Sequence, residues 1–146
     1  MSCTPPEELV GYGTLLQYQN PLNDEWVTVA GTLELESPED TDDGEVEATP
    51  DPDTGYKRFI PAKLSVLNEV SYEMNFRRSV AAIMKEFRRT KRMLPWRLVV
   101  MTPEQDYTQF CAYVKGYQEM YPEGNELITS TITLRPSGGP SYGTLN

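Results

Sequence analysis

Acidic side chains are the most concentrated chemical groups in this sequence. Ten carboxylates and no basic residue lie between Glu34 and Asp53. Two segments of this stretch, Asp40–Gly44 and Asp51–Gly55, superficially resemble calcium-binding loops. An EF-hand loop needs glycine at position six and a bidentate glutamate at position twelve, whereas counting from Asp40 puts glycine at five and aspartate at twelve. The motif fails, so a solvated turn or an interaction loop is favoured over a weak cation site.

The groups that most enzymes use are missing. The sequence has no histidine, which excludes histidine-based triads, zincin motifs and facial-triad iron sites. Acids on a flexible loop lack the fixed separation that glycoside hydrolysis requires. Cys111 stands between Phe110 and Ala112, which is typical of a buried strand residue rather than an activated nucleophile. We therefore expect no enzymatic activity, no catalytic or metal-binding residue and no cofactor.

Basic residues gather in a second stretch of the chain. Seven of the thirteen lie between Arg77 and Arg92, and the outer face of a predicted helix holds Lys85, Arg88, Arg89 and Arg92. A solvated helix end, a contact with an acidic protein and a nucleic-acid patch all fit this charge run. The aromatic residues that interleave a nucleic-acid patch are missing. Another copy of the same chain could supply the acids, since charge segregated in this way suits self-association.

Length and charge bound the class of protein. A chain of 146 residues suits one domain with its own core. The net charge of −9 opposes binding to phosphate backbones and anionic membranes. The first residues lack the basic and apolar regions of a signal peptide, and the longest apolar run, Val80 to Met84, is far too short to span a bilayer. We expect a protein made in the cytoplasm that does not cross a membrane, with its two cysteines reduced.

Hydrophobic periodicity predicts a mainly β fold, an antiparallel β-sandwich or barrel with one flanking α-helix. The expected strands are 12–19 and 26–36 as an opening hairpin, two strands within 56–76 that turn near 67–69, and 96–101, 110–118 and 127–135. The helix is predicted from about Ser79 to Lys91, with Ser79 as its N-cap. A single domain should cover 1–140, with a long acidic loop at about 37–55 and a flexible C-terminal tail at 141–146.

The order of these segments resembles the tail tube proteins, also called major tail proteins, of long-tailed bacteriophages. The resemblance runs over roughly Gly11 to Pro140 and rests on order and spacing. Its motifs are Gly-Tyr-Gly-Thr-Leu-Leu at 11–16, Trp26–Ala30, the acidic loop before Gly55–Pro61, Val70–Phe76 entering the single helix, Trp96-Arg97, Phe110–Tyr117, and Ile128–Ile132 before Ser137–Pro140.

This resemblance implies a virion structural protein that forms hexameric rings stacked into a hollow tube, through which DNA passes without stable binding. The implied partners are the chain itself, a tape measure protein, tail tip or baseplate proteins and a terminator. The implied location is the virion tail, after synthesis in the bacterial cytoplasm. The loop acids would make inter-subunit or ring-stacking contacts: Glu39, Asp40, Asp42, Asp43, Glu45, Glu47, Asp51 and Asp53. The basic helix face would contact neighbouring subunits, and Glu34, Glu36 and Glu73, which alternate with apolar neighbours, would face the lumen.

Two alternatives stay open. A ring-forming relative, such as a tail terminator, a connector or a type VI secretion tube protein, would share the fold. A β-sandwich module that binds a small ligand belongs to a different class, and it should concentrate aromatic residues in the loops at one end. Here Tyr12, Trp26, Tyr72 and Phe76 fall mostly within periodic segments, which favours core and interface roles.

Overall fold

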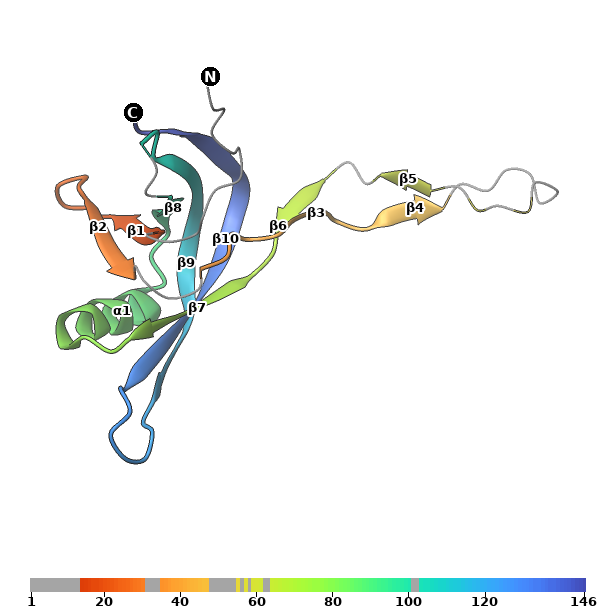
Figure 1. The fold of residues 1–146 in the computed structure, drawn as a ribbon. Coiled ribbons are helices and arrows are strands. Elements are labelled where there is room, and N and C mark those ends of the chain that lie inside the picture. Colours follow the sequence, from red (N-terminus) through yellow and green to blue (C-terminus); the bar gives the residue numbers. More distant parts are fainter. Residues whose placement is uncertain are drawn as a thin grey trace, which may run out of the picture.

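A computed structural model describes residues 14–30, 35–47, 55, 57, 59–61, 64–100 and 103–146. Within these residues the chain is mainly β, with a large antiparallel sheet and one helix, which confirms the predicted class (Figure 1). The sheet has the order β2-β1-β8-β9-β10-β7. Its strands are β1 (Leu15–Gln19), β2 (Trp26–Ala30), β7 (Val70–Asn75), β8 (Leu94–Val99), β9 (Asp106–Met120) and β10 (Thr129–Thr144).

One face of this sheet carries the core. Period-two alternation buries Val70, Tyr72 and Met74 in β7, and every second residue of the neighbouring strands lies on the same side. Trp96 is fully buried, and the ring of Tyr18 packs against it with centroids 5.6 Å apart. The predicted opening hairpin is confirmed as β1 and β2. In its turn, the Leu22 amide donates a hydrogen bond to Asn20 Oδ1 at 2.9 Å.

The helix α1 (Arg78–Thr90) covers this apolar face (Figure 1). Met84 is fully buried, while Val80, Ile83 and Phe87 are partly buried against the core. The helix starts one residue before the predicted boundary, and Arg77 rather than Ser79 occupies the N-cap, without a side-chain capping bond. Lys91 ends the helix in the left-handed region at φ 54°, and its amide donates to the carbonyl of Phe87.

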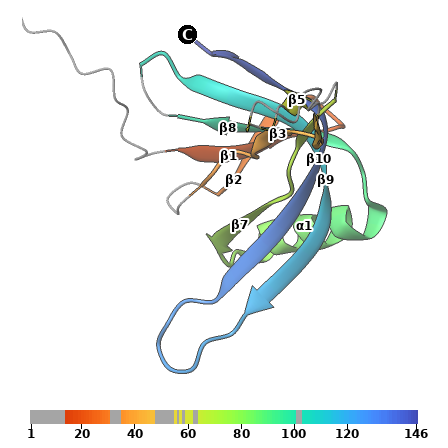
Figure 2. The same cartoon turned by 90° about the vertical axis from the view of Figure 1, so that its right-hand side faces the viewer.

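Strands β9 and β10 run side by side for most of their length and extend past the helix as a long hairpin (Figure 2). A β-bulge interrupts their register, because Thr133 pairs with Gly116 while Leu134 pairs with Val114. The extra residue reverses the alternation of β9 beyond this point. Tyr117 consequently lies on the side of the core and the helix.

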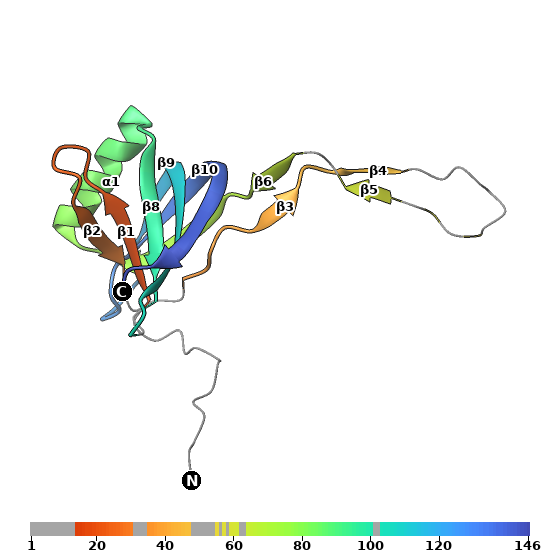
Figure 3. The same ribbon diagram turned by 90° about the horizontal axis from the view of Figure 1, so that it is seen from above.

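The segment predicted as a loop at about 37–55 has a different structure where it is described. Residues 40–47 form β3 (Asp40–Asp42) and β4 (Glu45–Glu47), which pair with β6 (Ser65–Leu67) and β5 (Phe59–Pro61). We call residues 40–47, 59–61 and 64–67 the arm, because its two short ladders project from the sheet on the side away from α1 (Figure 3). The predicted hairpin turn at 67–69 is wrong, since β6 pairs with β3 while β7 pairs with β10.

The C-terminal residues also differ from the expected flexible tail. Ser141–Thr144 belong to β10 and pair with Gln109 through Asp106 of β9, and the amides of Leu145 and Asn146 donate to the carbonyls of Gln105 and Glu104. No helix in the described ranges is long and apolar enough to span a membrane.

Candidate assembly surfaces

The arm brings most of the predicted interaction acids together. Four of them are exposed within β3 or directly beside it: Glu39, Asp40, Asp42 and Asp43. Their described contacts are weak ones: Asp42 Oδ1 accepts from Ser65 Oγ at 3.4 Å, and Glu39 Oε2 from Asn68 Nδ2 at 3.5 Å. None of the ion pairs between described residues involves these four acids. Their negative charge is therefore left for solvent or a partner.

The remaining candidate acids of this stretch divide into two groups. Glu45 and Glu47 belong to β4, where their register partners are Pro61 and Phe59 of β5. Asp51 and Asp53 lie outside the described residues. The structure therefore places six of the eight predicted acids on or beside the arm.

The part of the arm that holds β5 and β6 adds exposed apolar side chains. Phe59 is 52% exposed, Ile60 53% and Leu64 70%. None of the three belongs to the core cluster, and an isolated two-stranded ribbon is marginally stable in water. Gly44, between the two ladders, has φ +85°, a conformation that suits glycine. The arm thus combines acid with exposed apolar surface, and Leu67 at its base is the one described arm residue in the buried core cluster.

Ion pairs within the chain neutralise two of the four residues of the predicted basic helix face. Lys85 Nζ lies 3.2 Å from a carboxylate oxygen of Glu119, and Arg89 lies 2.7 Å from Glu86 one turn earlier. Arg88 and Arg92 are exposed, and no ion pair to either is found in the described part of the chain. These two arginines, at the C-terminal end of α1, are the part of the predicted face that retains unpaired positive charge.

Sequence reasoning missed the cluster around Glu119. Tyr117 and Tyr121 both donate hydrogen bonds to its carboxylate, and Lys85 reaches it from the helix. The Tyr121 and Tyr117 hydroxyls and then Lys85 lower the pKa of the Glu119 carboxyl, while burial and the bond to Glu119 raise the pKa of Tyr117 to about 12. The bulge in β9 creates this cluster, and Gly116 beside it, an isolated glycine inside a strand pattern, is the signal that could have indicated the bulge.

The outer face of the sheet is polar. Glu73 is exposed on β7 with Thr131 of β10 as its register partner, and the hydroxyls of Ser71 and Thr133 lie 3.1 Å apart. Glu36 is exposed just before the arm, close enough for its charge to add to burial in raising the pKa of Tyr72. Glu34 lies outside the described residues. Glu73 and Glu36 are thus both exposed, and their place in a lumen stays a prediction.

On this outer face Cys111 differs from the sequence interpretation, and Arg97 makes a contact that sequence reasoning missed. Cys111 was expected to be buried, but it is exposed because the core side of β9 is occupied by Phe110 and Ala112. Arg97 lies 4.1 Å above the ring of Trp26 and donates to Gln17 at 2.7 Å. Partial burial lowers the pKa of this arginine. The Arg97 contacts join β8 to the opening hairpin.

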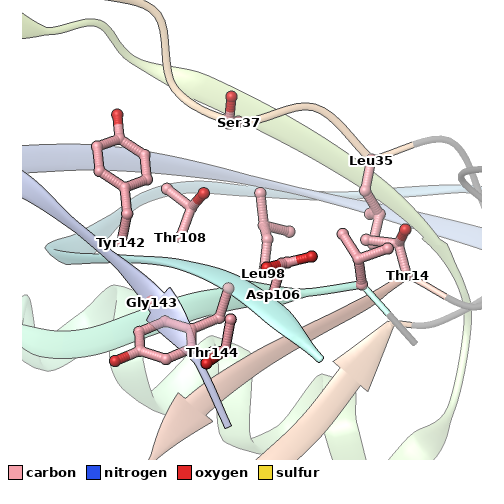
Figure 4. A pocket seen from close by; sticks show the side chains of 11 residues that line it. Thr14, Leu35, Ser37, Leu98, Asp106, Thr108, Tyr142, Gly143 and Thr144 are labelled. Carbon is pink, nitrogen blue, oxygen red and sulfur yellow. The ribbon is translucent and has the colours of Figure 1, made fainter. Parts of the chain in front are cut away.

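A hollow of about 580 Å³ lies at the end of the sheet where β10 finishes (Figure 4). Residues from five segments line it, including Leu35, Leu98, Thr108 and Tyr142. Asp106 is the one carboxylate among the lining residues that the structure describes. The described lining residues include no cysteine, lysine or arginine.

The chain matches no protein-family model and no curated protein sequence. Its fold is nevertheless found in solved tail-like assemblies. A chain of the anti-feeding prophage baseplate, 6-fold symmetrised, is 9% identical with a TM-score of 0.72, and the match covers 97% of each chain. A chain of the PVC extracellular contractile injection system, in its extended sheath-tube complex, is 7% identical with a TM-score of 0.70 over 95% of this chain and 93% of that one.

A third similar chain comes from the tail of an empty GTA particle with C6 symmetry. It is 11% identical with a TM-score of 0.64, over 88% of this chain and 93% of that one. At these identities the likeness concerns the fold. The fold implied by the resemblance in the sequence is therefore confirmed.

Proposed function

We propose that this chain is a structural subunit of a phage-type tail tube that assembles into hexameric rings and stacks them into a hollow conduit for DNA. The observation that carries the proposal is the arm, which projects from a domain whose fold recurs in six-fold symmetric tail assemblies. An arm with exposed apolar side chains favours burial against another subunit. The proposed location is the virion tail, after synthesis in the bacterial cytoplasm.

The other proposed partners follow from a conduit in a tail. They are a tape measure protein inside the tube, tail tip or baseplate proteins at one end and a terminator at the other. Double-stranded DNA would pass through transiently, because a net charge of −9 opposes stable binding to phosphates. Within this proposal the protein has a structural role and no enzymatic one.

A ring-forming baseplate or terminator component is the second candidate, and the similarity to a chain of a baseplate structure favours it. Electron microscopy of the concentrated protein separates the candidates. The tube proposal predicts hollow tubes of stacked six-fold rings, whereas the second candidate predicts single rings. A protein that stays monomeric at every concentration, by microscopy and sedimentation, would contradict both.

A further inference from the structure

A hollow of about 410 Å³ lies between the β1–β2 turn and α1, and we call it the helix groove. The turn and the helix lie side by side in two perpendicular views (Figures 1 and 3). The rings of Tyr18 and Phe87, which both line the groove, pack edge to face with their centroids 5.2 Å apart. Ile83 lines it one helical turn before Phe87. The groove therefore has an apolar floor of defined shape.

The β1–β2 turn holds an apolar side chain out in water beside this floor. Leu22 lines the groove and is 91% exposed. The amides of Leu22 and Asp24 donate to Asn20, at 2.9 Å to its Oδ1 and at 2.8 Å to its carbonyl oxygen. The Asn20 amide donates to the Glu25 carbonyl at 2.7 Å. An exposed leucine that an ordered turn holds against an apolar floor forms a patch typical of an interaction site.

Arginines stand at both ends of the helix wall. Arg92 lines the groove beyond the C-terminal end of α1, and Arg78 lies four positions before the lining residue Ala82, on the same helix face. Both arginines are exposed, and the ion pairs between described residues include neither. Glu86, the one carboxylate among the described lining residues, lies 2.7 Å from Arg89. The helix wall thus has an apolar centre between two positive ends.

These features restrict the chemistry of an occupant. Apolar side chains at its centre would contact the floor, and carboxylates at its ends would face the two arginines. The lining comes from a turn, a helix and the inner strand β1, so it offers no free strand edge. An extended peptide would leave backbone groups unpaired against it, whereas a helix pairs its own. Since α1 has 13 residues and is about 20 Å long, an acidic amphipathic helix of similar length matches the groove.

A second copy of this chain does not match that description. The described residues contain one helix, α1, and its exposed side carries Arg78, Arg88 and Arg92. Placing the helix of one copy in the groove of another would bring arginine against arginine, which is unfavourable. The turn acids Asp24 and Glu25 are not among the lining residues and so offer no compensation inside the groove.

We propose that the helix groove binds an acidic amphipathic helix of another protein. Leu22, Ile83 and Phe87 contact the apolar side of that helix, and Arg78 and Arg92 face carboxylates near its two ends. The inference goes beyond the proposed function, because it concerns a second kind of protein on the helix side of the subunit rather than contacts between copies of this chain.

A synthetic peptide tests this chemistry. The probe is a labelled helical peptide of about 13 residues, with leucines at i, i+3, i+4 and i+7 and glutamates at both ends. Fluorescence anisotropy should show that it binds at least about tenfold more tightly than the same peptide with lysines at the ends. A net charge of −9 repels the acidic peptide from the rest of the surface, so this preference reports the local arginines. Benzoylphenylalanine at the central leucine should crosslink to residues 18–22 or 82–92.

Variants on the exposed rim test the named contacts without disturbing the core. Leu22→Asp should weaken binding of the acidic peptide by about tenfold or more, because an apolar contact is lost. Arg78→Glu and Arg92→Glu should each weaken it by about fivefold, because attraction becomes repulsion. The matched controls are Leu127→Asp, at a leucine 72% exposed in the β9–β10 hairpin, and Arg135→Glu in β10. Both should bind like the wild type, and circular dichroism checks that every variant is folded.

Each outcome supports the inference or overturns it. Equal binding of the acidic and basic peptides, crosslinks outside 18–22 and 82–92, or unchanged binding by the three rim variants would overturn it. Assembled protein should bind the acidic peptide as well as free subunits do, and loss of binding on assembly would show that a second copy fills the groove instead. Electron microscopy tests the proposed function separately, so a protein that forms tubes and binds no acidic peptide loses only this inference.

Discussion

The degree of burial separates two side chains of the helix α1, Met84 and Ser79. Met84 is fully buried, whereas Ser79 is exposed and makes no capping bond, although its position before an apolar run is typical of an N-cap. The chain instead enters the helix through Arg77, whose extended backbone fills the capping position.

Truncating Met84 should therefore cost far more stability than truncating Ser79. We expect Met84→Ala to lower the free energy of unfolding by about 2–5 kcal/mol, because it removes buried methylenes and leaves a cavity. Ser79→Ala should change it by less than about 0.5 kcal/mol, as at other exposed sites. Urea denaturation of both variants measures the difference, and a loss above about 1 kcal/mol for Ser79→Ala would show that this hydroxyl caps the helix after all.

Glu119 should make folding stability depend on acid pH. Hydrogen bonds from Tyr121 and Tyr117, together with Lys85, lower the pKa of its carboxyl below that in the unfolded chain. A lowered carboxyl pKa stabilises the folded state above the unfolded pKa, and this stabilisation is lost as pH falls through the folded value. Glu119→Gln should therefore flatten the loss of stability between about pH 5 and about pH 2. The control is Glu123→Gln at the exposed hairpin tip, and equal slopes for all three proteins would contradict the assignment.

Secondary-structure elements were predictable where one face is buried. The alternation over 70–76 predicts β7, and the helical spacing from Val80 to Phe87 predicts α1, because the apolar period is itself the signal. The arm was missed since residues 40–47 are mostly polar and pair with a segment about twenty residues away. The end of β10 was missed because Ser137–Pro140 is typical of a loop, although pairing with β9 resumes at Ser141.

The candidate sites were likewise only partly predictable from the sequence. Sequence alone located the acids and the arginines, because charge runs are visible without a fold. It could not show that Lys85 is internally paired, since its partner Glu119 lies on a strand displaced by a bulge. The pair of Glu86 and Arg89, by contrast, follows helical spacing and was open to prediction. It also could not find the hollow of about 410 Å³ between the β1–β2 turn and α1, because the two lining segments, at 18–22 and 82–92, are sixty residues apart in the sequence.

Excising the arm should separate folding from assembly. Residues 39 and 68 are adjacent, since the Asn68 amide donates to the Glu39 carbonyl at 2.8 Å. Replacing residues 40–66 with a short glycine linker should therefore leave the sheet and helix folded, because the described core residues lie outside the excised segment. We expect cooperative melting and a monomer in sedimentation and electron microscopy. Tubes formed by this variant would show that the arm is dispensable for assembly.

At the scale of the whole molecule, negative charge governs the expected behaviour toward DNA. With a net charge of −9 and Glu73 exposed on the polar face, assembled protein should form no stable complex with double-stranded DNA at physiological salt. A gel-shift titration measures this. Glu73→Lys should keep the fold, with a change in stability below about 0.5 kcal/mol, and should slow DNA delivery if Glu73 lines the channel. A tight, salt-sensitive complex with the wild type would contradict a passive conduit.

The β9–β10 hairpin has a consequence for the order in which the chain folds. Its strands are neighbours in sequence, joined by residues 121–128, whereas β1 must find β8 across more than seventy residues. Local pairs form before distant ones because closing a long loop costs more entropy. The hairpin should therefore belong to the folding nucleus, and β1 and β2 should dock after the rate-limiting step.

Stopped-flow kinetics would reveal this order. Val114→Ala in the hairpin should mainly slow refolding, while Val29→Ala in β2, at a similarly buried position, should mainly speed unfolding. The hairpin is also the last part of the domain to leave the ribosome. The earlier strands of each nascent subunit would then wait, with their edges unpaired, until β9 and β10 have emerged.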